Sequence, residues 1–150
     1  MIQFTNPILD RRPETALRDP AIIQQNGEYI ALFTQVDCIG ERTVTSLATA
    51  RSPNLSEWTN FKTIANGPDM LCAPGNVIRH EDTWICCLQS YPIPAGDTYG
   101  DESSRLYLMR SDDLRFWSEP SVIENDGACV QWADSPRQID PFLVEHDGRY

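Results

Sequence analysis

The sequence has no long apolar segment and little positive charge. No stretch approaches the roughly 20 consecutive apolar residues of a membrane-spanning helix, and no basic amphipathic stretch suits a membrane surface. The 150 residues include 22 acidic and only 12 basic side chains, which gives a net charge of −10. Because binding to nucleic-acid phosphates requires a basic surface, this composition argues against nucleic acid and against membranes as partners.

Two further absences concern cysteine and targeting. The five cysteines are an odd number and none forms a CxxC pair, so the sequence offers no zinc or redox centre and predicts neither a metal nor a cofactor. Residues 1–10 contain no basic stretch followed by an apolar run, which a secretory leader requires. We therefore expect a cytoplasmic protein whose thiols are reduced.

A sustained 3.6-residue period, which marks helices, is missing as well. Turn residues such as Asn26-Gly27 recur at short intervals instead, and this pattern predicts an all-β fold. The expected strands span residues 20–23, 28–36, 45–50, 58–64, 76–79, 83–89, 104–110 and 121–124. The long connection from Tyr91 to Ser103 is either a solvated surface loop or a rim loop over a substrate cleft.

One motif occurs twice, 121 positions apart. Asp19-Pro20 is followed by aliphatic, glycine and tyrosine positions that recur at this offset after Asp140-Pro141. The matched positions are Ile22, Ile23, Gly27 and Tyr29 with Leu143, Val144, Gly148 and Tyr150. An intermediate copy follows the first by 55 positions, and there Pro74 stands in place of Asp19. Self-similarity of this kind indicates a repeat architecture.

A second repeated element supports the same register. Residues 45–64 match residues 104–123 at an offset of 59, with six identities and no gap. The identical pairs are Leu47/Leu106, Arg51/Arg110, Ser52/Ser111, Leu55/Leu114, Trp58/Trp117 and Ile64/Ile123. The unit is therefore roughly 55–65 residues long and has about four strands, which is the pattern of a propeller blade.

The repeats divide the chain into blade 1 at about residues 18–65, blade 2 at about 73–125 and the start of blade 3 at about 138–150. The last copy stops one residue into its second expected strand. Because each blade buries its faces against its neighbours, we interpret the chain as a fragment of a longer propeller; the alternative is a small domain that ends there. Uncovered blade faces would also favour self-association.

Two carboxylates at equivalent places in the repeat form the candidate site. Proline disfavours the α region for the residue before it, so Asp19 and Asp140 are expected in an extended conformation where a strand enters the sheet. Since the inner strands of a propeller line its centre, both carboxylates should face one axis within about 10 Å, the scale of a sugar-hydrolysing pair. The plainer alternative is a turn Asp, because Asp-Pro is a common turn pair.

Two residues near these aspartates are candidates for substrate binding. Arg18 precedes Asp19, and Trp132 lies in a polar segment shortly before Asp140, where its ring could stack on a sugar face. The repeated turns at residues 52–58 and 111–117 end in Trp58 and Trp117, which we expect to pack between blades rather than to bind sugar.

These residues resemble the five-bladed β-propeller glycosidases, above all family 43 glycoside hydrolases and the related clan of invertase-like enzymes. The resemblance rests on the order and spacing of short motifs across nearly the whole chain. They lie at residues 6–9, 18–23, 26–29, 73–77, 83–84, 110–117, 139–142 and 147–150. The resemblance implies an all-β, five-bladed propeller of which this chain holds about two and a half blades.

The resemblance also implies roles. Asp19 would be the general base, and Asp140 would modulate the pKa of the general acid and orient the substrate. The acid would be a Glu from a later blade, expected after residue 150, so that the chain alone would be inactive. The implied function is an inverting, arabinosidase- or xylosidase-like glycoside hydrolase with a carbohydrate substrate. The alternatives are a non-catalytic carbohydrate-binding propeller and a protein-interaction propeller without a small-molecule site.

Overall fold

The computed structural model describes residues 13–124 and 135–150. These residues form eight strands in two antiparallel four-stranded sheets, each with its strands paired in chain order. The first sheet contains β1 (Thr15–Gln25), β2 (Glu28–Ile39), β3 (Arg42–Ser52) and β4 (Thr59–Ala65). The second contains β5 (Val77–His80), β6 (Thr83–Gln89), β7 (Leu106–Ser111) and β8 (Ser121–Val122). The all-β prediction is confirmed, and the fold is a partial β-propeller of about two blades.

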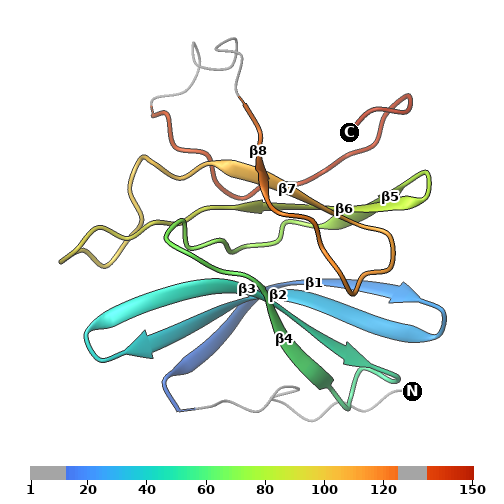
Figure 1. Cartoon of the computed structure of the whole chain (residues 1–150), viewed down its shortest axis with the longest axis horizontal. Helices are drawn as coiled ribbons and strands as arrows, with labels where there is room; N and C mark the ends of the chain where they lie inside the picture. The colour runs from blue at the N-terminus through green and yellow to red at the C-terminus, as the bar shows by residue number, and fades with distance from the viewer. Residues whose placement is uncertain (1–12, 125–134) are drawn as a thin grey trace.

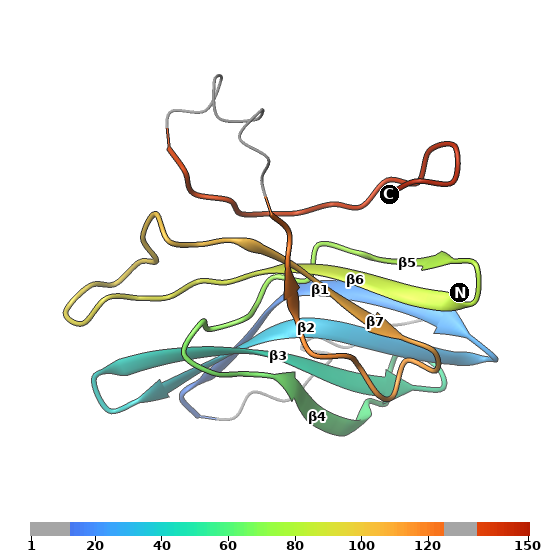
Figure 2. The same ribbon diagram turned by 45° about the horizontal axis from the view of Figure 1, so that its top comes forward.

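The two sheets lie face to face, and residues 135–150 run along the far side of the second sheet (Figure 1). The turned view shows the same three layers (Figure 2). Contact between β1 and β5 brings the first strands of the two sheets together. The segment 135–150 carries only an isolated bridge, between His146 and Arg149, in place of the strands of a third sheet.

The core between the sheets follows the two-residue alternation of their strands. Buried side chains from both sheets meet in two clusters, which contain Ile30, Leu32, Trp84, Cys86 and Leu114, and Leu47, Ala65, Leu71, Leu88 and Met109. Ala31 and Phe33, which alternate with Ile30 and Leu32, belong to a third cluster on the other side of the first sheet. Burial of this apolar surface, at about 25 cal/mol per Å², holds the two blades together.

The two repeated turns have matching hydrogen bonds. Ser52 Oγ accepts a hydrogen bond from the Leu55 N–H at 2.8 Å, and Ser111 Oγ accepts one from the Leu114 N–H at 2.8 Å. Both leucines have a positive φ, of 66° and 60°. Asp113 caps its turn by accepting from the N–H groups of residues 116 and 115, which lower the pKa of its carboxyl. The equivalence predicted at an offset of 59 is thus confirmed.

The tryptophans that end these turns differ in one hydrogen bond. Trp117 packs against the two clusters between the sheets, and Trp58 packs on the opposite side of the first sheet. The indole N–H of Trp58 donates to the Leu55 carbonyl at 3.1 Å. The equivalent carbonyl of Leu114 instead accepts from Arg51 Nη2 at 2.7 Å, and the buried indole N–H of Trp117 has no partner among the described residues.

No helix long and apolar enough to cross a membrane occurs in residues 13–124 and 135–150.

Candidate active site

Three residues with a left-handed backbone each stand directly before a proline. They are Asp19 with φ of 53°, Ala73 with φ of 46° and Asp140 with φ of 55°. Positive φ is uncommon in residues other than glycine. It costs of the order of 1–3 kcal/mol, which interactions with the surrounding structure must offset. The prediction that Asp19 and Asp140 have extended backbones is therefore wrong. The strained backbone recurs once in each of the three copies of the motif.

Asp19 lies inside β1 rather than at the start of the strand. Arg18 pairs with Thr34 of β2, and Ala21 pairs with Leu32, so β1 has one extra residue between these two pairs. This is a β-bulge, a feature that redirects side chains and accommodates proline. The bulge explains why the sequence misplaced the start of β1, since Pro20 interrupts the pairing without ending the strand.

Thr34 contacts two of the three left-handed residues at once. Its Oγ1 donates to Asp19 Oδ2 at 2.9 Å and accepts a hydrogen bond from the Ala73 backbone N–H at 2.7 Å. Gln89 stands 55 positions later, at the equivalent place in β6, and its Oε1 accepts from the Asp140 backbone N–H at 2.6 Å. A side chain on the second strand of each sheet thus holds the left-handed residue of the following repeat.

The two residues directly before β5 fix the segment that carries Asp140 at two more points. The side-chain amide of Asn76 donates to the Leu143 carbonyl at 3.0 Å and accepts from the Leu143 N–H at 2.7 Å. Gly75 lies so close to Pro141 that a Cβ on this glycine would overlap the proline carbonyl oxygen. The position of Asp140 is therefore set by Gln89 of the second sheet and by Gly75 and Asn76, which directly precede that sheet.

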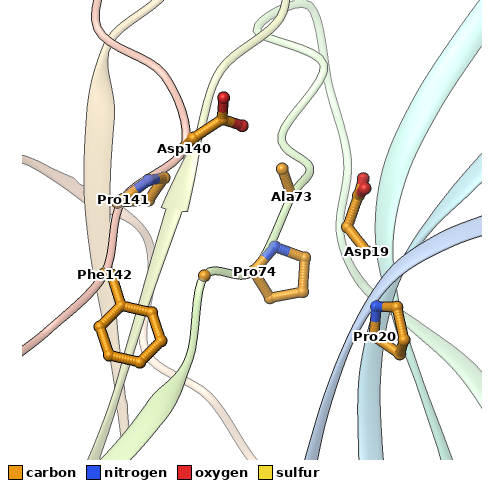
Figure 3. A pocket seen from close by; sticks show the side chains of 8 residues that line it. Asp19, Pro20, Ala73, Pro74, Asp140, Pro141 and Phe142 are labelled. Carbon is orange, nitrogen blue, oxygen red and sulfur yellow. The ribbon is translucent and has the colours of Figure 1, made fainter.

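Asp19 and Asp140 line a cavity of about 320 Å³, here called the central cavity. Its walls come from all three copies of the motif and include Pro20, Ala73, Gly75, Pro141 and Phe142. Figure 3 shows the two carboxylates on either side of Ala73, pointing to the same side of the pocket. The structure thus brings together the two aspartates that lie 121 positions apart in the sequence.

A second cavity, here called the loop cavity, adjoins the first and also measures about 320 Å³. Asp19, Ala73 and Asp140 line both cavities. Arg18 lines the loop cavity, and the connection that follows β6 supplies part of its wall, through Tyr91, Ile93, Thr98 and Tyr99. This placement favours the rim-loop interpretation of residues 91–103. Trp132 lies outside the described residues.

Cys72 also lines the loop cavity, next to Ala73. Burial raises the pKa of its thiol to about 11, and a hydrogen bond with Thr45 acts against that rise. The thiol is therefore neutral at physiological pH and is a poor nucleophile or metal ligand. Within the part of the chain that the structure describes, no group of three His, Cys, Asp or Glu side chains could hold a metal ion.

The chemical capacity of the site lies in its two carboxylates. Asp19 and Asp140 are both exposed, and no other acidic side chain lines either cavity within the described residues. One oxygen of Asp19 is held by Thr34, whereas no described group donates to the other. The pair can accept a proton and impose negative charge on a neighbouring group.

Sequence reasoning missed the residues that position the aspartates, namely Thr34, Gln89, Asn76 and Gly75. A signal for two of them was present, because Thr34 and Gln89 are related by the same 55-residue offset that relates the first motif to its intermediate copy. The contacts of Asn76 and Gly75 join residues that lie 66 or 67 positions apart, and no repeat offset points to them.

No protein-family model matches the sequence, and no curated protein matches it significantly. Solved structures do match. An N-acetylgalactosamine deacetylase from F. plautii, in complex with blood group B trisaccharide, shares 15% identity at a TM-score of 0.61, over 80% of this chain and 40% of its own. A family 117 glycoside hydrolase from the marine bacterium Zobellia galactanivorans shares 18% identity at a TM-score of 0.56, over 78% of this chain and 40% of its own.

A Bacillus subtilis arabinanase is also similar, with 20% identity and a TM-score of 0.51, over 68% of this chain and 36% of the arabinanase. The chain thus spans about two fifths of the length of these three solved structures, which have propeller folds. At these identities the likeness shows the fold. The resemblance to propeller glycosidases is confirmed at that level: the chain has the fold of part of a glycoside hydrolase β-propeller.

Proposed function

We propose that these residues form part of the catalytic propeller of an inverting glycoside hydrolase, with Asp19 as general base. The observation that carries this proposal is the meeting of Asp19 and Asp140 in one cavity, each with a strained backbone and each hydrogen-bonded by a side chain of a sheet, at the carboxylate of Asp19 and at the backbone N–H of Asp140. Strain of this kind persists where the surrounding structure maintains it, and it clusters at active sites.

In the proposed mechanism, the free Oδ1 of Asp19 takes a proton from a water molecule that attacks the anomeric carbon. Thr34 holds Oδ2 at 2.9 Å and so fixes the direction in which the carboxylate faces the water. Inversion requires an acid on the other side of the glycosidic bond, about 6.5–9.5 Å from the base, with space for the water between them.

Asp140 is the proposed modulator of that acid. Its carboxylate would raise the pKa of a neighbouring Glu by like-charge repulsion and so keep the Glu protonated for transfer to the leaving oxygen. No third acidic residue lines the cavities in the described part of the chain, and on the resemblance to propeller glycosidases we propose that the acid is a Glu of a later blade, after residue 150. Proposed substrates are arabinose- or xylose-containing glycans, and the arabinanase is one of the matched structures.

Hydrolysis of aryl α-L-arabinofuranosides and β-D-xylosides tests the proposal. The 150-residue chain should be inactive, because the lack of leaving-group protonation forfeits a contribution of roughly 10²–10⁴-fold. A version that continues in frame beyond Tyr150 should hydrolyse at least one of these pentosides with inversion, which NMR of the first-formed anomer detects.

In that longer version, Asp19→Asn should abolish turnover while the fold is retained, because an amide keeps the shape of the side chain but cannot take the proton. Asp140→Asn should weaken activity. It should also shift to lower pH the limb of the pH profile that reports ionisation of the general acid. Binding of pentosides without turnover in the longer version would instead support a non-catalytic carbohydrate-binding propeller. Turnover at a normal enzymatic rate by the isolated chain would contradict the proposal of an external acid.

A further inference from the structure

The loop cavity has one wall that neither sheet supplies. It comes from the connection after β6, through Tyr91 and Tyr99, and from Arg137 in the segment of residues 135–150. Hydrogen bonds hold the base of this connection: the Ser90 N–H donates to the Arg105 carbonyl at 2.8 Å, and the Arg105 N–H donates to Ser90 Oγ at 2.8 Å. The wall is therefore anchored at its base.

Tyr91 and Tyr99 have different surroundings in this wall. Tyr91 is packed, since a Cβ on Gly100 would lie 3.1 Å from three of its ring atoms. Tyr99 lines the same cavity but is 75% exposed. An aromatic ring with an apolar face and a polar hydroxyl, placed at the edge of a cavity with both charged and apolar lining residues, suits the apolar face of a sugar ring. The structure thus offers a stacking surface beside the two carboxylates.

Arg137 adds a positive charge to this wall. Its guanidinium lies 5.4 Å from the centre of the Tyr91 ring, a cation–π contact that orients the group without neutralising it. No described carboxylate lies within 4.0 Å of Arg137, or of Arg18 in the same cavity. These two arginines balance Asp19 and Asp140, so the cavity lining is neutral in a chain of net charge −10.

We propose that this wall is a second sugar subsite and that it selects a sugar bearing an anionic group. The sugar ring lies on Tyr99, and its carboxylate or sulfate ester binds the Arg137 guanidinium. Arginine is well suited to this role because its planar fork of donors can bind such a group through two hydrogen bonds. The inference rests on the proposed function only in that a neighbouring sugar would occupy the site between Asp19 and Asp140.

Three matched probes test the subsite on the 150-residue chain: methyl β-D-glucuronide, methyl β-D-glucoside 6-sulfate and methyl β-D-glucoside. Titrations followed by amide NMR should show that at least one anionic probe binds about tenfold more tightly than the neutral one, the effect of one charge-assisted contact. The difference should shrink as salt is raised. Which anionic probe binds best identifies the group that the subsite takes.

Two variants and two controls assign the effect. Arg137→Gln should remove the preference for the anionic probe, whereas Arg115→Gln, at an exposed turn position that lines neither cavity, should retain it. Tyr99→Ala should weaken binding of all three probes several-fold, whereas Phe116→Ala, at a ring that is 74% exposed, should not. Amide spectra of the variants show whether each remains folded.

Equal affinity for the three probes would overturn the proposal of an anionic subsite, and so would a preference for the anionic probe that survives Arg137→Gln. Either result would leave the proposed hydrolase function standing, because that function depends on Asp19, Asp140 and the general acid, and not on Tyr99 or Arg137. Conversely, an anionic preference that depends on Arg137 supports the subsite even if Asp19→Asn has no effect on turnover in the longer version. The two proposals therefore fail independently.

Discussion

The side chain of Gln89 accepts a hydrogen bond of 2.6 Å from the backbone N–H of Asp140. Gln89 ends β6, and Asp140 lies in the segment that follows the second sheet. Thr34 of β2 makes the equivalent bond to the Ala73 N–H at 2.7 Å. The two bonds show that each sheet fixes the strained residue at the start of the next repeat, so the geometry of the site is built between neighbouring repeats.

Replacing Gln89 with Leu should destabilise the fold and displace Asp140. The Asp140 N–H would lose its acceptor, and a typical hydrogen bond contributes about 0.5–1.5 kcal/mol. Urea unfolding should show a loss of this size, and the Asp140 amide resonance should move. Gln24→Leu, at an exposed position of β1, is the control and should change the free energy of unfolding by less than about 0.5 kcal/mol. Equal effects of the two substitutions would contradict the role of Gln89.

Gly75→Ala should be among the most disruptive small substitutions in the chain. The added methyl group would overlap the Pro141 carbonyl oxygen, and a backbone atom cannot move aside as a flexible side chain can. Overpacking of this kind costs about 1–3 kcal/mol or more. Gly27→Ala is the control, because open space surrounds Gly27 and its φ of 79° is its only obstacle to alanine, whereas the φ of Gly75 is not in that region. Unfolding midpoints that rank Gly27→Ala as the more damaging change would be inconsistent with the structure.

Arg51→Met should weaken the packing of the two sheets. The guanidinium bonds Glu28 at 2.6 Å and the Leu114 carbonyl at 2.7 Å, and hydrogen bonds of charged groups contribute about 1.5–3 kcal/mol. The substitution should lower the free energy of unfolding by about that amount. It should also free the Leu114 carbonyl for the Trp117 indole, so the Trp117 indole N–H resonance should shift more than that of Trp58.

Arg42→Met, at an exposed position of β3 without such bonds, is the control for Arg51. An unchanged Trp117 indole signal in folded Arg51→Met would show that Arg51 does not compete for the carbonyl.

Stability should fall above about pH 9, partly because of Cys72. Burial raises the pKa of this thiol from 9.0 to about 11. The folded state therefore keeps a proton that the unfolded state releases, and the resulting stability is complete below pH 9.0 and is lost as the pH rises towards 11. Unfolding measured at pH 8 and pH 10 should show a smaller decline for Cys72→Ser than for the unsubstituted chain. Identical pH dependence would indicate that Cys72 does not contribute.

Much of the fold could be predicted from the repeats, because the offsets bring equivalent residues into equivalent places. The turns at Ser52 and Ser111 show this most clearly, since their hydrogen bonds match. The backbone of Asp19 could not be predicted in the same way. Local sterics favour an extended residue before proline, but the bulge in β1 and the hydrogen bond from Thr34 override that preference.

The pairing of Asp19 with Asp140 could be anticipated because both residues belong to one repeated motif. The contacts that hold Asp140 could not, because Gly75 and Asn76 meet Pro141 and Leu143 only after neighbouring repeats have packed. The unpaired indole of Trp117 likewise depends on Arg51 reaching across from the first sheet. Long-range packing, rather than local pattern, determines these details.

The most direct test is a crystal structure of the chain soaked with L-arabinose or D-xylose. We predict that the sugar occupies the central cavity, with its anomeric carbon facing Asp19 and one hydroxyl bound to Asp140, and that Asp19→Asn retains the bound sugar. A pentose bound elsewhere on the molecule, with the space between Asp19 and Asp140 empty, would contradict the claim that these two aspartates belong to a sugar-hydrolysing site.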